Sequence, residues 1–242
     1  MHGPGGLSGS WNVIWGALAG VPPNVRPWHP HWCALSGLRC ALDAWLPGLG
    51  GTVLDVGCGA KPYAGLLTGA GRHLGLDIGP WADIRVDPGQ VWPLEDAQID
   101  AVLCTEVIEH VPDLDFVVGE MTRVLRPGGM LVVTAPFVFP LHGLPHDYRR
   151  FAPAELERLF APAFEVVQSR LLGGVGSAVA GLVNSFPFDA LAGSTGGRLA
   201  KGAMLPLWPV LFGSVNLLAW CADRIDATGR YGTDCLLVAR RH

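Results

Sequence analysis

The stretch that decides the fold is residues 52–63, which read TVLDVGCGAKPY. Its first part, Thr52–Val56, is a short apolar run with several β-branched side chains, which is typical of a buried parallel strand. The run breaks at Gly57-Cys58-Gly59, where two glycines allow the backbone to turn sharply and to approach a ligand closely. Pro62 suits the first turn of a helix. The stretch therefore predicts a strand, a ligand-binding loop and the start of a helix.

A second apolar run, His73–Asp77, ends in a carboxylate 18 positions after Gly59. In a βαβ nucleotide site, an acid at about this distance binds the ribose hydroxyls. The third glycine of the dinucleotide fingerprint would fall at position 62, which is proline. The sequence thus predicts a nucleoside site that is not an NAD site.

Further motifs follow in order, and together they resemble one enzyme family. They are Val53–Gly59, Leu76–Asp77, Trp92–Asp96, Ile99–His110 and Val124–Leu131. The chain is similar in these segments to the class I S-adenosylmethionine-dependent methyltransferases, in particular the type 11 methyltransferase-domain group. The similarity is close from Gly51 to Phe137, and looser as far as Gly173 and at Tyr231–Arg240. It implies an enzyme with S-adenosyl-L-methionine as its cofactor and an α/β, Rossmann-like fold, a doubly wound, mostly parallel seven-stranded sheet with helices on both faces.

Alternating strand and helix patterns along the chain agree with such a sheet. The expected strands are residues 52–56, 73–77, 82–86, 99–105, 130–135, 164–170 and 235–239, the last of them antiparallel. The expected helices are residues 32–46, 63–70, 114–124 and 153–160, and residues 126–129 are expected to form a turn.

The composition limits the function classes. A net charge of −4 argues against a nucleic-acid-binding protein, which normally carries a basic patch. Only 16% of the residues are charged and the mean hydropathy is +0.33, so apolar surface is expected outside an ordinary core. The six cysteines show no metal-ligand spacing, and no metal site is predicted. Reduced thiols and the lack of a secretory signal pattern predict a cytoplasmic protein, with the inner face of the membrane as a further location.

An apolar segment, residues 171–225, separates the last two expected strands. Within it, residues 203–222 carry no charge, but Pro206, Pro209 and Gly213 argue against a straight spanning helix. A hairpin on the membrane surface, an apolar cap over the active site and a membrane span stay open as alternatives. The predicted division is 1–50, an N-terminal Gly/Pro/Trp-rich extension with a leading helix and disorder over 1–10; 51–170, the core; 171–228, an apolar helical insertion; and 229–242, the last strand.

The resemblance assigns the methyl donor to residues at the ends of the first four strands. They are Asp55, Gly57, Cys58, Gly59, Asp77, Ile78, Asp87, Thr105 and Glu106. Asp87 stands where relatives contact the adenine amine, but the next residue, Pro88, has no N–H to donate to the ring.

The loop after the fifth strand, residues 136–151, is rich in polar side chains where the acceptor should approach. A hydroxyl acceptor needs a base poised near neutral pH, so His142 or His146, oriented by Asp147, is the predicted catalytic group. His110, Tyr148 and Arg149 are expected to contact the acceptor. The alternative is structural: His146, Asp147 and Arg149 form a hydrogen-bonded loop that fixes the acceptor lid.

The resemblance implies methyl transfer, and the expected acceptor is a small molecule or a lipid-linked or glycan precursor, methylated on oxygen. The lipid-linked or glycan acceptor is a hypothesis that rests on the apolar segment and on the polar His/Tyr/Arg loop. Two alternatives stay open: a non-catalytic scaffold of the same fold that acts through its apolar segment, and an isoprenoid or quinone methyltransferase. The expected partners are the acceptor and the membrane surface, through residues 171–225, with no nucleic acid.

Overall fold

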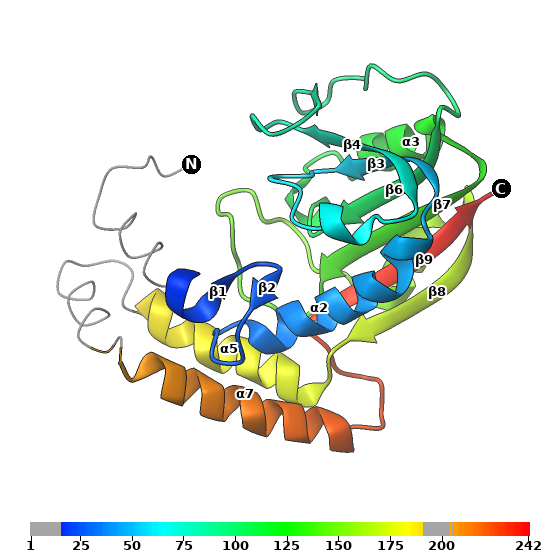
Figure 1. The fold of residues 1–242 in the computed structure, drawn as a ribbon. Helices are drawn as coiled ribbons and strands as arrows, with labels where there is room; N and C mark the ends of the chain where they lie inside the picture. Colours follow the sequence, from blue (N-terminus) through cyan, green and yellow to red (C-terminus); the bar gives the residue numbers. More distant parts are fainter. Residues whose placement is uncertain (1–15, 191–203, 205) are drawn as a thin grey trace.

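The computed structural model describes residues 16–190, 204 and 206–242, and its centre is a seven-stranded sheet in the order β5-β4-β3-β6-β7-β9-β8 (Figure 1). The strands are β3 (Gly51–Val56), β4 (Ala70–Asp77), β5 (Ile84–Arg85), β6 (Ile99–Thr105), β7 (Leu125–Pro136), β8 (Phe164–Leu172) and β9 (Asp234–Arg241). Strands β3 to β7 pair in parallel, and β9 runs antiparallel between β7 and β8. The predicted fold class is confirmed.

Helices cover both faces of this sheet because its strands are apolar on both sides. In β3, Leu54 belongs to the core shared with α3 (Leu114–Val124) and α4 (Pro153–Phe160), whereas Val53 belongs to the core under α2 (Trp32–Trp45). This alternation follows from the two-residue period of a strand. Because β3 pairs in parallel with both β4 and β6, the carboxyl ends of these three strands lie together at one edge of the sheet.

Two local predictions are corrected. The helix expected over residues 63–70 is only a 3₁₀ turn, η2 (Ala64–Leu66). A Cβ on Gly69 would lie 2.5 Å from the carbonyl oxygen of Pro47, so the chain after η2 packs directly against the segment before β3, and β4 begins at the next residue. The turn expected over residues 126–129 is a bulge within β7, where the pairing with β6 shifts between Ile99 and Ala101.

The apolar segment forms a hairpin of two antiparallel helices, α5 (Val175–Ala190) and α7 (Trp208–Ile225), on the far side of α2 from the sheet (Figure 1). No helix in the described ranges combines the length and the apolar character needed to cross a bilayer. The disorder predicted for residues 1–10 lies outside the described residues.

Buried asparagines attach the hairpin to the segment before α2. The side-chain amide of Asn216 donates to the carbonyl oxygens of Pro27 and His29, both at 2.8 Å. Asn184 donates to Pro30 O at 2.9 Å and to Asn216 Oδ1 at 3.0 Å. A small two-stranded ribbon, β1 (Gly20–Val21) and β2 (Asn24–Val25), precedes this segment.

Candidate active site

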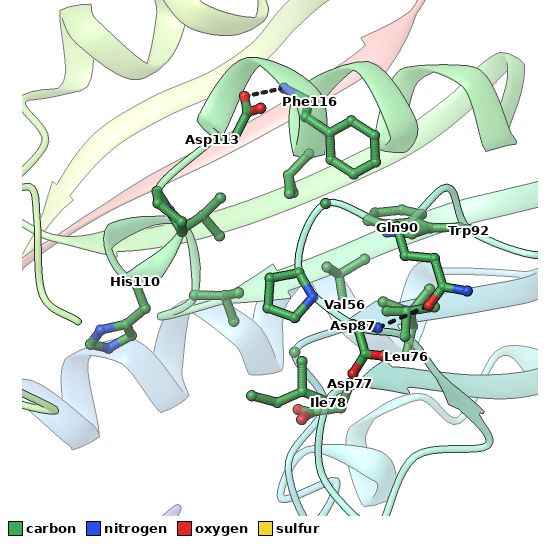
Figure 2. Close-up of a pocket in the computed structure, with 18 of the residues that line it drawn as sticks. Val56, Leu76, Asp77, Ile78, Asp87, Gln90, Trp92, His110, Asp113 and Phe116 are labelled. Carbon is green, nitrogen blue, oxygen red and sulfur yellow. Dashed lines mark hydrogen bonds between the residues drawn. The ribbon is translucent and has the colours of Figure 1, made fainter. Parts of the chain in front are cut away.

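A cavity of about 390 Å³ opens at the carboxyl ends of β3, β4 and β6. Figure 2 shows Asp77, Ile78 and Asp87 on its lower side, Phe116 from α3 on its upper side, and His110 at its left end. Ligands of open parallel sheets bind at this edge. Five of the residues predicted for the donor line the cavity: Gly57, Asp77, Ile78, Asp87 and Glu106.

Asp77 is held by two backbone amides. Its carboxylate accepts hydrogen bonds from Gly59 N at 2.9 Å and from Gly79 N at 2.7 Å. A carboxylate has about four acceptor positions, so two remain for a ribose diol. Gly57 in the same loop has φ +68°, and a Cβ there would lie 2.3 Å from Val107 Cγ2, so this turn requires glycine.

Asp55, at the end of β3, and Cys58, within the loop, are buried and do not line the cavity. Asp55 is buried and faces His73, with Oδ2 3.1 Å from Nε2, and burial raises the pKa of its carboxyl group. Burial also raises the pKa of the Cys58 thiol to about 11. Thr105 and Gly59 are likewise absent from the cavity wall, although Gly59 reaches it through its bond to Asp77. These four residues support the loop or its strands.

The wall also contains residues that the sequence did not indicate as ligands. Gln90 lines the cavity and accepts a hydrogen bond from Asp87 N at 3.1 Å (Figure 2). Trp92 is almost fully buried against the cavity, and Phe116 projects from the first turn of α3. Trp92 is the first residue of the motif Trp92–Asp96, so the sequence contained an indication of it. Gln90 and Phe116 come from a loop and a helix that contain no such motif.

The loop after β7 fixes His142 through an ion pair. Asp147 Oδ2 accepts from the His142 backbone N–H at 2.7 Å and lies 3.4 Å from His142 Nδ1. Arg150 binds both oxygens of Asp147, at 2.6 and 2.7 Å, and this contact lowers the pKa of the aspartate. Glu109 beside His142 raises the pKa of the imidazole. Of the two predicted bases, only His142 is therefore oriented by Asp147.

His142 also meets His110 at the mouth of the cavity, with their Nε2 atoms 3.2 Å apart. The second predicted base, His146, and the predicted acceptor residues Tyr148 and Arg149 make hydrogen bonds within the protein. His146 Nδ1 lies 2.9 Å from the Tyr148 hydroxyl, and Arg149 donates to the carbonyl oxygens of Val111 and Pro112. The structure brings His110 and His142 together at the cavity and leaves His146 on the outer side of the loop.

Two buried acids lie close together at the site, Glu106 in the cavity wall and Asp234 from β9. Burial, with Asp234 close by, raises the pKa of Glu106, whose buried Oε1 has no hydrogen-bond partner. Burial likewise raises the pKa of Asp234 to about 6, while Thr233 donates to its Oδ2 at 2.6 Å. The sequence did not indicate Asp234, because it comes from β9, far along the chain.

Comparison with known proteins agrees with this geometry. Residues 54–133 match the family model described as a methyltransferase domain. A probable S-adenosylmethionine-dependent methyltransferase of Mycolicibacterium smegmatis is 37% identical over 138 residues, which cover 48% of this chain and 53% of that protein. A ubiquinone biosynthesis O-methyltransferase of Xylella fastidiosa is 32% identical over 169 residues, 53% of this chain and 69% of that protein. The chain thus spans only about half of the first relative's length.

Among solved structures, an S-adenosylmethionine-dependent methyltransferase from Archaeoglobus fulgidus has a TM-score of 0.54 at 15% identity, over 96% of this chain and 99% of that chain. This likeness concerns the fold. The fold and the cavity define a Rossmann-like protein built to bind a nucleoside-containing donor. With the sequence relatives, they show that the chain belongs to the S-adenosylmethionine-dependent methyltransferases, in the type 11 group. The cofactor is S-adenosylmethionine, as in that family.

Proposed function

We propose that this chain transfers the methyl group of S-adenosylmethionine to an oxygen atom of a small or lipid-linked acceptor. The observation that carries the proposal is the continuity of one cavity from Asp77 to His110. Asp77 is available for the donor ribose, and His110 leads to His142 on the acceptor loop. Donor and acceptor groups thus meet in one space.

The donor needs little covalent help, because its sulfonium charge already activates the methyl group. Positioning and exclusion of water supply most of the rate. The Gly57–Gly59 loop and Asp77 would hold the donor, with Ile78 and Asp87 beside the adenine. The acceptor oxygen attacks the methyl carbon in line with the sulfur, and the C–S bond electrons return to sulfur. The acceptor proton is removed at the His110–His142 pair.

An apolar acceptor is supported by the surface around the helical hairpin. Phe186, Val210 and Leu218 are about 70% exposed, an unusual degree for large apolar side chains on neighbouring helices. The hairpin is also connected to the acceptor loop. His31, which follows the segment bound by the hairpin, packs against Phe139 in a tilted arrangement with 5.3 Å between the ring centroids. Phe139 in turn meets the His142 ring edge to face, with 5.5 Å between the centroids. The relatives from Xylella include ubiquinone biosynthesis O-methyltransferases, which favours a phenolic acceptor with an apolar tail.

Radiolabelled S-adenosylmethionine tests the proposal. The protein is incubated with a water-soluble catechol, or with a catechol carrying a polyprenyl tail in phospholipid vesicles. We expect label in the phenolic methyl ether, faster with the vesicle-borne acceptor. Asp77→Ala is the control for the donor site and His146→Gln the control for the loop. Absence of labelled ether from both acceptors and from a panel of soluble alcohols would contradict O-methylation.

A further inference from the structure

Three side chains meet at the mouth of the cavity: Glu109, His110 and His142. Their facing atoms form a small triangle. The two Nε2 atoms are 3.2 Å apart, and Glu109 Oε1 lies 3.5 Å from that of His110 and 3.7 Å from that of His142. Ligands that stand about 2.0–2.2 Å from one ion are about 3.0–3.6 Å from each other. The triangle therefore has the size of a metal-ligand set.

The hydrogen bonds of the two rings determine which nitrogen carries a lone pair. His110 Nδ1 lies against the carbonyl oxygen of His146. His142 Nδ1 lies 3.3 Å from Pro140 O and 3.4 Å from Asp147 Oδ2. These oxygens only accept, so each neutral ring carries its proton on Nδ1 and its lone pair on Nε2. Metal-binding imidazoles are held in this way, with the second nitrogen donating to a carbonyl or a carboxylate.

Glu109 gives an independent indication of a ligand. Its side chain is fully buried, and neither carboxylate oxygen has a hydrogen-bond partner. A buried carboxylate without a donor is costly unless a cation compensates for the lost water. Its Oε1 faces the two Nε2 lone pairs. One cation at this point would satisfy all three groups.

We propose that Glu109, His110 and His142 bind a divalent first-row transition-metal ion such as Zn²⁺. Two imidazoles and one carboxylate are a catalytic zinc ligand set, which keeps positions open for water or substrate. Mg²⁺ and Ca²⁺ prefer sites made of oxygen ligands. The sequence predicted no metal, because the ligands are dispersed and the cysteines show no spacing.

The consequence for catalysis rests on the proposed function. An acceptor hydroxyl bound to the ion would lose its proton to solvent, because the ion lowers its pKa. The resulting oxyanion would attack the methyl carbon, and the sulfur would leave with the C–S electrons as S-adenosylhomocysteine. His142 then acts as a ligand in the metal-loaded protein and as the predicted base only in the metal-free protein.

Calorimetric titration with Zn²⁺ tests the site, after dialysis of the whole chain against a chelator. We expect one Zn²⁺ per chain, binding at least about 100-fold weaker in Glu109→Gln and His142→Gln, and no saturable heat with Mg²⁺. His146→Gln is the matched control, because that imidazole lies outside the triangle, and it should bind Zn²⁺ as the wild type does. Wild-type protein that binds no Zn²⁺, or equal binding by His142→Gln, would overturn the proposal.

Two readouts separate a lost ligand from a lost fold and from failure of the methyl-transfer proposal. Co²⁺ added to the wild type should give the visible absorption of a four- or five-coordinate ion, whereas the spectrum of the free aqua ion would contradict the site. S-adenosylhomocysteine titrations of the same variants report the donor site. Zn²⁺ binding without methyl transfer would leave the metal site standing, and methyl transfer without Zn²⁺ binding would remove the metal site alone.

Discussion

At the scale of single residues, backbone amides position the Asp77 carboxylate, the group on which the proposed donor site depends most. Asp77 is bound by the N–H groups of Gly59 and Gly79, so its carboxylate keeps its place without a neighbouring cation. This arrangement leaves the negative charge free to polarise hydroxyl donors of a ligand. The aspartate of the acceptor loop differs in this respect. Asp147 is neutralised by Arg150, and it orients His142.

The residues at the strand ends could be predicted because a parallel sheet binds its ligands there. Asp77 and Glu106 follow apolar runs directly, and both line the cavity. Gln90 and Phe116 could not be predicted, since their approach depends on how a loop and α3 pack over the sheet. The pairing of His110 with His142 likewise depends on the folding back of a loop 32 residues away.

His29 should make folding stability depend on pH. Burial first, and the charge of His31 second, lower the pKa of His29 to about 4, and its Nδ1 accepts the His31 backbone N–H at 3.1 Å. The unfolded chain takes up a proton near pH 6.5 and the folded chain does not. The contribution of His29 is therefore complete above pH 6.5 and is lost as the pH falls towards 4, by at most about 3 kcal/mol.

Urea unfolding of the wild type and of His29→Asn at pH 7.5 and pH 5 measures this contribution. Asparagine keeps an acceptor for the His31 N–H but does not titrate. Comparing the two proteins cancels the opposite effect of Asp234, whose raised pKa disfavours the folded state as the pH rises towards 6. We expect the wild type to lose more stability than the variant between the two pH values. Equal losses would show that folding does not lower the pKa of His29.

Hydrogen-bonded asparagines, at the scale of elements, hold the helical hairpin in place. Asn216 lies fully buried on α7 and joins α5 and the segment before α2. The apolar composition of residues 171–225 predicted helices and exposed apolar surface, but not this attachment. The sequence alone does not show whether an asparagine in an apolar run is buried, because that depends on hydrogen-bond partners from distant parts of the chain.

Asn216→Ala should lower the free energy of unfolding by about 2–4 kcal/mol. It removes the amide that donates to the carbonyl oxygens of Pro27 and His29, and the oxygen that accepts from Asn184. Leu217→Ala is the matched control on the same helix, since Leu217 is 60% exposed and should change stability by less than about 0.5 kcal/mol. Chemical denaturation followed by tryptophan fluorescence measures both. A cost for Asn216→Ala no larger than that of the control would show that the network contributes nothing.

The whole molecule combines a methyltransferase sheet with an apolar surface attached beside its acceptor loop. We expect this surface to bring the protein to phospholipid vesicles that contain anionic lipid, with Arg224 and Arg230 near the surface. Phe186→Ser combined with Leu218→Ser should weaken vesicle binding at least about tenfold, because each exposed apolar side chain contributes about 1.5–3 kcal/mol when it is buried.

Vesicle flotation measures this binding. Val167→Ser on β8 is the control, because Val167 is 45% exposed but lies outside the hairpin. Wild-type protein that stays in the aqueous fraction at every lipid concentration would contradict membrane binding by the hairpin.

The most direct test of the central claim is calorimetric binding of S-adenosylhomocysteine to the wild type and to Asp77→Ala. We expect saturable binding at one site by the wild type, and a loss of about 2–4 kcal/mol, a drop of about 30- to 1000-fold in affinity, in the variant. Asp77→Asn keeps an acceptor for one glycine amide and should show an intermediate loss. Asp43→Ala, an exposed position on α2, should bind as the wild type does. Absence of binding by the wild type, or unchanged binding by Asp77→Ala, would contradict the donor site.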